Sequence, residues 1–327
     1  MPFADIVGNN RKKGILINYI KKDRIPYSMI FSGPESANLS EFSLGLAKSI
    51  NCTSMKYDFC DFCDNCTAIN KSVFPDVVLL LPDGQFYKKE QIVDLIQKNF
   101  KRPLISDKKI FILSDANKMN ESSSNSFLKV LEEPSDSTIF ILLTNNKSQL
   151  LPTIRSRCQV LYFYTPSKKE VETHLIKMGY DTEKAKLLSS ISSSSIENVL
   201  KEDFYSFQNK RSSVLLILEK LLKKRKIDEV LLSLHDQSRS RSKFIDSFVE
   251  MINLISLMLR DIMILKIELE KEFLINIDFY DKLVELQKYI TEKEILYLIR
   301  KMEFLQRDIK RNLNSKILIL EFINSYV

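Results

Sequence analysis

Short apolar runs bounded by polar residues, which are typical of buried strands in a parallel sheet, recur along the first half of the chain. They lie at residues 27–32, 75–81, 109–115, 139–143 and 159–163. Between them, apolar residues recur every three or four positions, which predicts amphipathic helices. These helical segments lie at residues 9–22, 39–50, 88–100 and 121–131. The alternation predicts an α/β domain over residues 1–164, in which helices cover a parallel sheet.

The second half of the chain has helical periodicity throughout. Ser167 precedes Glu170 by three positions, as in a capping box, and residues 165–209 are predicted to form a small helical lid. Beyond about residue 210, apolar residues at helical spacing predict two broad apolar faces. They are Phe244, Phe248, Met251, Ile252, Ile255, Leu259, Ile262 and Met263, and then Leu296, Ile299, Met302, Phe304 and Leu305. Residues 210–327 are therefore predicted to form an all-helical domain, which serves either for oligomerisation or only to pack a core of its own.

The composition allows a sizeable buried core and sets broad limits on function. Hydrophobic residues make up 44% of the 327 residues and charged residues 28%, and the 6 glycines and 9 prolines favour a helix-rich protein. The formal charge of +7 permits contact with nucleic acid without requiring it. Residues 1–10 lack the pattern of a signal peptide, and the most apolar window, residues 248–265, is interrupted by charged residues. We therefore expect a soluble, cytoplasmic protein without a membrane segment.

Four of the five cysteines lie close together, with the spacing C-x7-C-x2-C-x2-C. They are Cys52, Cys60, Cys63 and Cys66. In a reducing compartment such a cluster favours metal over disulfides, and four thiolates complete a tetrahedral shell around Zn²⁺. A four-iron cluster lacks its usual downstream C-P here, and a redox C-x-x-C pair leaves two cysteines without a role. The spacing predicts a structural Zn²⁺ site in an insert at residues 52–66, with iron–sulfur or free-thiol chemistry as the open alternatives.

Residues 33–40 lie between a predicted strand and a predicted helix, which is the setting of a phosphate-binding P-loop. The pattern G-x-x-x-x-G-K-[ST] places backbone N–H groups and a lysine against the phosphates, and a hydroxyl on Mg²⁺. Gly33 and Ser40 match this pattern. Asn38 replaces the second glycine and Leu39 replaces the lysine, so an isobutyl group stands where an ammonium is needed. The P-loop is therefore predicted to be degenerate.

The strand at residues 109–115 departs from the pattern of a nucleotide site a second time. A Walker B strand normally ends in Asp-Glu, where the first residue organises Mg²⁺ and the second activates water. Here the corresponding residues are Ser114 and Asp115. Because both elements are altered, we expect no ATP hydrolysis by this chain, while binding of nucleotide without turnover stays open.

Ser156-Arg157-Cys158 lies between the last two predicted strands. A guanidinium held there on a rigid scaffold can reach a phosphate bound by a neighbouring subunit, although an isolated arginine of this kind is usually a plain surface residue. Its context favours the first interpretation. Residues 128–134, Thr144 and residues 151–159 together resemble the clamp-loader ATPase family of the AAA+ class.

The resemblance implies an AAA+ α/β module with a degenerate P-loop, a small helical lid and an all-helical collar that joins a ring of subunits. It implies a non-hydrolysing component of the bacterial DNA polymerase III holoenzyme, which helps to load a sliding clamp onto primed DNA. The implied partners are the motor (gamma/tau) and delta subunits, the sliding clamp and primer–template DNA. Arg157 is the implied arginine finger, acting in trans on ATP bound by the adjacent motor subunit.

Two other functions compete with this one. The first is a catalytically active gamma/tau-like ATPase of the same complex, which Leu39 and Ser114 disfavour. The second is a zinc-dependent nucleic-acid-binding protein outside any ATPase ring. That interpretation leaves Arg157 and the helical collar without a role.

Overall fold

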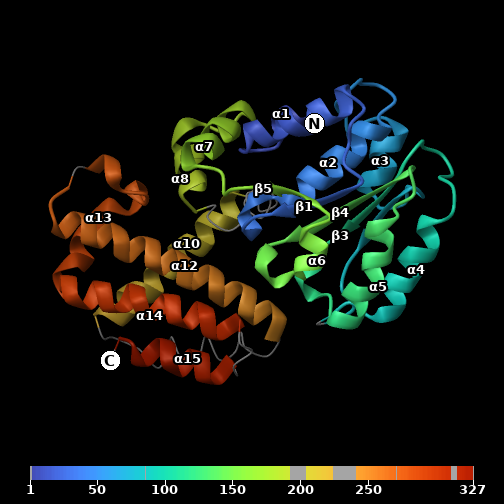
Figure 1. The fold of residues 1–327 in the computed structure, drawn as a ribbon. Coiled ribbons are helices and arrows are strands. Elements are labelled where there is room, and N and C mark those ends of the chain that lie inside the picture. The colour runs from blue at the N-terminus through green and yellow to red at the C-terminus, as the bar shows by residue number, and fades with distance from the viewer. Residues whose placement is uncertain are drawn as a thin grey trace. The chain divides into compact units, whose positions relative to one another are not determined.

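The computed structural model of the chain describes residues 2–84, 86–191, 204–223, 241–269, 271–310 and 315–326. The chain divides into two compact units, Met1–Ile196 and Glu197–Val327. Each unit is described by itself below (Figure 1). The predicted division into three domains, with boundaries at residues 164 and 209, stays a prediction, and residues 192–203 of the predicted lid lie outside the described residues.

The first unit is built on a five-stranded sheet with the order β2-β3-β4-β1-β5. All four strand pairs are parallel. The strands are β1 (Ser28–Ser32), β2 (Val77–Leu80), β3 (Lys109–Leu113), β4 (Thr138–Thr144) and β5 (Gln159–Tyr162). Every residue of β1, β3 and β4 is buried, as the uninterrupted apolar runs predict for strands covered on both faces.

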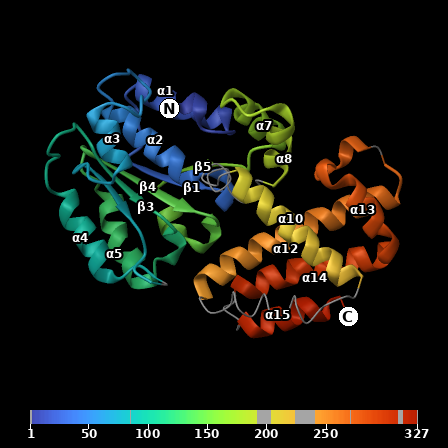
Figure 2. The same ribbon diagram turned by 180° about the vertical axis from the view of Figure 1, so that it is seen from behind.

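Helices lie on both faces of this sheet (Figures 1 and 2). The helices of the first unit are α1 (Asn10–Lys21), α2 (Leu39–Asn51), α3 (Asp64–Asn70), α4 (Lys89–Asn99), α5 (Glu121–Glu132), α6 (Pro152–Arg155), α7 (Lys168–Lys177) and α8 (Thr182–Ile191). Alternate strand residues face opposite layers, since Phe31 belongs to the core under α1 and α2, while Ile30 belongs to the core under α4 and α5. The predicted α/β architecture is confirmed.

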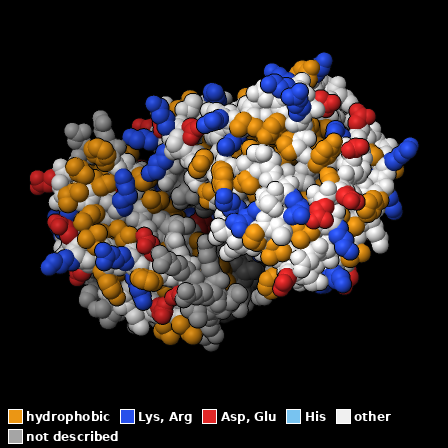
Figure 3. All heavy atoms as spheres, in the orientation of Figure 1, with side chains coloured by type: hydrophobic (Ala, Val, Ile, Leu, Met, Phe, Trp, Pro, Cys, Tyr) orange, Lys and Arg blue, Asp and Glu red, His pale blue; other side chains and the backbone are white. Residues whose placement is uncertain are grey.

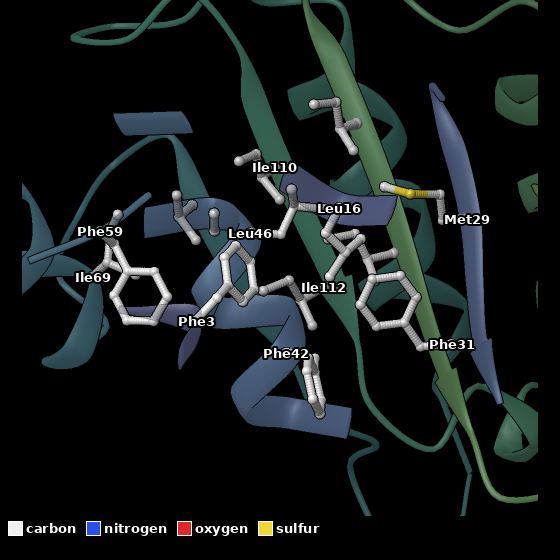
Figure 4. Packing of buried hydrophobic residues seen from close by; sticks show 14 of the residues in the cluster. Phe3, Leu16, Met29, Phe31, Phe42, Leu46, Phe59, Ile69, Ile110 and Ile112 are labelled. Carbon is white, nitrogen blue, oxygen red and sulfur yellow. The ribbon is translucent and has the colours of Figure 1, made fainter. Parts of the chain in front are cut away.

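The core on the α1–α2 face extends to the N-terminal segment and the cysteine insert (Figure 4). Phe3 and Phe59 are both buried, and their rings meet edge to face with centroids 5.3 Å apart. Phe3 also donates its backbone N–H to the carboxylate of Asp58 at 3.0 Å. The insert is therefore packed against the main core and is not a detached loop.

The described residues of the second unit form helices and contain no strand, which confirms the all-helical prediction. The helices are α10 (Phe204–Leu222), α12 (Arg241–Lys266), α13 (Tyr280–Leu286), α14 (Glu292–Lys310) and α15 (Ser315–Asn324). The predicted apolar face of α12 is buried from Phe244 to Ile262. No helix in the described part of the chain is long and apolar enough to cross a membrane.

The predicted apolar face of α14 is wrong for two residues. Leu296 and Phe304 are 48% and 57% exposed. The buried positions instead follow the alternating three- and four-residue spacing of an amphipathic helix. They are Ile295, Leu298, Met302, Leu305 and Ile309.

A buried arginine holds the connection between α12 and α13. Arg211 is fully buried and donates to both carboxylate oxygens of Asp278 at 2.8 and 2.9 Å, and to the side-chain oxygen of Asn276 at 2.7 Å. Asn276 in turn donates from its backbone and side chain to Asp261, which is also fully buried. A buried guanidinium requires partners of this kind, so these contacts fix the path of the connection.

A second buried carboxylate fixes the loop that precedes β3. Asp76 is 1% exposed and accepts hydrogen bonds from the backbone N–H groups of Leu104, Ile105 and Ser106 at 2.7–2.9 Å. Burial by itself raises the pKa of the Asp76 carboxyl, but these N–H donors outweigh burial and bring that pKa below its ordinary value.

We expect Asp76→Asn to lower the free energy of unfolding of the first unit by about 1–2 kcal/mol at pH 7, because the charged acceptor of several N–H groups is lost. Since the pKa of Asp76 is depressed in the folded state, its contribution is present above about pH 4 and is lost as pH falls through the folded pKa. Urea denaturation at pH 7 and at about pH 3 measures both effects. The exposed Asp136, changed to Asn, is the matched control. An equal deficit at both pH values would contradict the assignment.

Candidate functional site

The four predicted cysteines lie together where α2 leads into α3. Their Sγ atoms all lie within 4.8 Å of one another. The Cys52–Cys60 distance is 3.6 Å, and the Cys52–Cys63 and Cys60–Cys66 distances are 4.0 Å. Tetrahedral Zn–S bonds of about 2.3 Å place sulfurs about 3.8 Å apart, so these residues fit a four-thiolate metal site. The cluster could therefore hold a metal ion.

Local backbone contacts set the positions of these sulfurs. The backbone N–H of Met55 donates to Cys52 Sγ, and that of Cys63 donates to Cys60 Sγ, each at 3.3 Å. The side chain of Asn65, in the first turn of α3, donates to the carbonyl of Asn51 at the end of α2 at 2.9 Å. The two helices that carry the outer cysteines are thus joined directly.

Cys158 lies outside this cluster, as expected. It packs at the edge of the core on the α4–α5 face, and burial raises the pKa of its thiol to about 12. A thiol with such a pKa stays protonated at neutral pH and is a poor nucleophile and metal ligand.

The degenerate P-loop spans the connection from β1 to α2. Asn38 is buried and has the left-handed backbone conformation, with φ of 53°, which asparagine tolerates better than most residues. Leu39 begins α2, and its side chain packs against the hydrophobic core. The position that carries an ammonium in a working P-loop is therefore occupied by part of the apolar packing.

The chain that follows β5 closes over this loop. A Cβ atom placed on Gly33 would lie 2.5 Å from the carbonyl oxygen of Phe163, so only glycine fits there. The hydroxyls of Ser36 and Thr165 are hydrogen-bonded at 2.7 Å. The backbone N–H of Gly33 also donates to the carbonyl of Thr144 at the end of β4, at 3.1 Å. The loop is therefore held on two sides by neighbouring strands.

The end of β3 also makes local contacts. The backbone N–H of Ser114 donates to the carbonyl of Leu80 at 3.0 Å, and the buried Tyr87 hydroxyl lies beside the Ser114 carbonyl oxygen. Asp115 has a left-handed backbone, with φ of 49°, and pairs with Lys118 at 2.9 Å. The carboxylate at this position is therefore already paired with a cation of its own chain.

Arg157 lies between β4 and β5, directly after the short helix α6. Its guanidinium donates to the carbonyl of Thr153 at 3.0 Å and to the carboxylate of Glu132, at the end of α5, at 2.6 Å. The Arg157 side chain is 35% exposed and that of Glu132 51%. These contacts orient the guanidinium at the surface, and neither partner belongs to the P-loop.

Neither α6 nor the contact between Glu132 and Arg157 was predicted from the sequence. Four residues are too few to show helical periodicity, although Pro152 at the first position of α6 is a usual start signal. Glu132 and Arg157 are 25 positions apart, and such a pair leaves no local pattern in the sequence.

The first half of the chain is similar to subunits of DNA polymerase III. A family profile described as "DNA polymerase III, delta subunit" matches residues 8–167. The DNA polymerase III subunit delta' of Bacillus subtilis is 36% identical over 207 residues, which cover 63% of each chain. DNA polymerase III subunit gamma/tau of Mycoplasma pneumoniae is 33% identical over 175 residues, which cover 54% of this chain and 25% of the relative. The chain thus spans less than two thirds of the length of these relatives.

A solved structure extends the likeness in fold to almost the whole chain. The gamma subunit-related protein of Thermotoga maritima is 19% identical, covers 96% of this chain and 98% of its own, and superposes with a TM-score of 0.50. At that identity the likeness concerns the fold alone, and it agrees with the predicted AAA+ architecture followed by a helical region. Residues 8–167 thus match the delta-subunit model of DNA polymerase III, and over part of its length the chain is similar to DNA polymerase III subunits delta' and gamma/tau.

Proposed function

We propose that the chain is the non-hydrolysing, delta'-type subunit of a DNA polymerase III clamp loader. In this role it assembles with motor (gamma/tau) and delta subunits, and the assembly loads a sliding clamp onto primer–template DNA. Its own contribution is Arg157, which stabilises the charge that develops on ATP bound by the adjacent motor subunit. The observation that carries the proposal is a surface arginine with an oriented guanidinium on a chain whose own nucleotide site is dismantled.

The orientation of Arg157 suits a group that acts on another subunit. A guanidinium binds phosphate through a planar fork of N–H donors, so its plane must be set before the phosphate arrives. Thr153 and Glu132 hold that plane at the end of α6, close to the rigid sheet. Because the Glu132 contact is exposed, the guanidinium can exchange it for a phosphate at little cost.

The absence of hydrolysis is inferred from two separate losses. The side chain of Leu39 cannot offset phosphate charge, and it contributes to the core instead. Ser114 offers no carboxylate to Mg²⁺, and the carboxylate of Asp115 is paired with Lys118. Either loss weakens catalysis, since one removes a cation from the phosphates and the other removes a carboxylate from Mg²⁺.

The metal proposed for the cysteine cluster is Zn²⁺, held by Cys52, Cys60, Cys63 and Cys66. Four thiolates at these separations leave no open coordination position, so the ion supplies folding energy to the insert and no catalysis. An iron–sulfur cluster is disfavoured because its usual downstream C-P pattern is missing from the sequence.

A nucleic-acid-binding protein outside any ATPase ring is less well supported. On the face shown in Figure 3, the described lysine and arginine side chains are spread among acidic and apolar ones and do not form a basic stripe. A stripe of that kind is the usual electrostatic footprint of independent nucleic-acid binding.

Protein purified without added zinc is expected to contain about one Zn²⁺ per chain, the stoichiometry of a closed four-thiolate site. Cys66→Ser should remove most of the metal and lower the thermal stability of the first unit, because Cys66 is buried in the core. Cys158→Ser should leave the metal content unchanged. Elemental analysis measures both variants, and iron or a metal-free wild-type protein would contradict the proposal.

The isolated chain is expected to show no ATP turnover above background. Leu39→Lys alone should stay inactive, because Asn38, Ser114 and Asp115 remain unsuited to bind phosphate and Mg²⁺. A coupled phosphate-release assay measures turnover. Hydrolysis that Ser40→Ala abolishes would show that the site of this chain is active after all.

Arg157→Ala is expected to lower DNA- and clamp-stimulated ATPase and clamp loading by the reconstituted complex. The loss at the affected site should be about 10³-fold or more, and smaller for the whole assembly, where other sites keep their fingers. Arg157→Lys should be nearly as poor, because an ammonium lacks the planar fork. Folding and zinc content should not change, since an exposed ion pair contributes about 0–1 kcal/mol.

Glu132→Gln is the matched control for Arg157. It removes the negative charge of the ion pair but keeps a side-chain oxygen that can accept the hydrogen bond from the guanidinium, so the orientation of Arg157 is retained and ATPase and clamp loading should stay near wild type. If Glu132→Gln were as damaging as Arg157→Ala, the ion pair and not the finger would explain the loss. Normal loading by an Arg157→Ala complex that assembles fully would refute the proposed role.

A further inference from the structure

Lys48 is a buried cation that neither the packing of α2 nor the proposed role of Arg157 requires. It lies on α2, four residues before Cys52, and only 10% of its side chain is exposed. Lysine is almost never buried without a partner, because its ammonium loses hydration. Its partner here is the carboxylate of Asp61, which lies between Cys60 and Cys63. The ion pair therefore joins a core helix to the turn that carries two of the four cysteines.

Asp61 needs such an anchor. Its φ of 66° puts it in the left-handed region, which residues with a Cβ atom seldom adopt. The Asp61 carboxylate accepts from Lys48 and also from the side chain of Asn70, at the end of α3, at 3.1 Å. These contacts from α2 and α3 hold the turn in the conformation in which Cys60 and Cys63 face the same point.

The ammonium of Lys48 is itself fixed on its other side. It lies 4.2 Å from the centroid of the Phe59 ring, a cation–π distance, and Phe59 packs against Phe3 in the core. The core thus holds the ammonium of Lys48 in one position, where it pairs with the carboxylate of Asp61. Four thiolates around a divalent cation carry a net negative charge, which a neighbouring ammonium also offsets.

We propose that Lys48 is a positioning residue for the metal site, acting through Asp61 on the Cys60-x2-Cys63 turn. This inference rests on the proposed four-cysteine zinc site. Residues that orient metal ligands from outside the first coordination shell typically change metal affinity about 10- to 100-fold when they are removed. Lys48 and Asp61 should show the same effect without being ligands themselves.

The test is zinc affinity of the full chain, measured by competition with a chromophoric chelator. Lys48→Met and Asp61→Asn should each weaken zinc binding by about 10-fold or more. Asparagine keeps the shape of Asp61 and tolerates the left-handed backbone, so the second variant isolates the charge. The double variant should be little worse than either single variant, because both remove one shared interaction.

Two controls separate positioning from general effects. Lys56→Met removes an exposed lysine from the same insert. The ammonium of Lys56 lies over the Tyr57 ring, and its removal should leave zinc affinity unchanged. Lys48→Arg keeps the cation and should keep most of the affinity. Cobalt(II) titration supplies a spectroscopic readout, since a displaced Cys60 or Cys63 alters the absorption bands of the tetrahedral thiolate complex.

The outcomes are distinct. A wild-type chain that takes up no zinc overturns the proposed metal site and this inference with it. Wild-type zinc binding with unchanged affinity and cobalt spectra in Lys48→Met and Asp61→Asn overturns this inference alone. If Lys48→Met fails to fold, the Asp61→Asn and Lys48→Arg variants decide the question, and additive losses in the double variant would also contradict the coupling.

Discussion

β1 lies between β4 and β5 in the sheet. Its hydrogen bonds to both strands determine which residues lie next to one another at the carboxyl ends of the three strands. In this register Ser32 stands opposite Thr144 on one side and Tyr162 on the other. The degenerate P-loop therefore leaves the sheet between the ends of two strands. Because parallel strands end at one edge, residues that are more than a hundred positions apart in the sequence are brought together there.

The same strand pairing explains how a P-loop can lack its lysine and still keep its backbone conformation. The backbone contacts of Gly33 to Thr144 and of Ser114 to Leu80 do not depend on the side chains that bind phosphate or Mg²⁺. Replacing lysine by Leu39 even adds an apolar side chain to the core. The segment from β4 to β5, which carries Arg157, is thus supported by a sheet whose packing rests on backbone contacts and apolar side chains.

The α/β part of the fold could be predicted because its signals are local. Uninterrupted apolar runs identified the five strands, and α1, α2, α4 and α5 agree with the predicted segments to within a few residues, whereas α3 and α6 were not predicted. The face of α14 was misassigned because its apolar residues are numerous enough to suggest two faces, and only packing selects the one through Ile295 and Met302. The cysteine cluster was found from spacing alone, since all four ligands lie in one short insert.

The pairs that orient functional groups could not be predicted in the same way. Glu132 ends α5 while Arg157 follows α6, 25 positions later, and Lys48 meets Asp61 only because α2 and the insert share a core. The sequence indicates only that Lys48 lies on the inner side of an amphipathic helix. It does not indicate that Asp61 is the residue with which Lys48 pairs. Such contacts depend on tertiary packing, which a single sequence does not encode in any local pattern.

Gly33 shows that one position of a functional motif can also have a purely steric role. This glycine matches the first position of the phosphate-binding pattern, yet its environment demands glycine because the Phe163 carbonyl passes where a Cβ atom would stand. Steric necessity would keep a glycine here in a chain that never meets a nucleotide. In a protein of this fold, a glycine that matches a phosphate-binding motif can therefore be required only by the close approach of two strand ends. The lysine position of the motif is the better indicator of nucleotide binding.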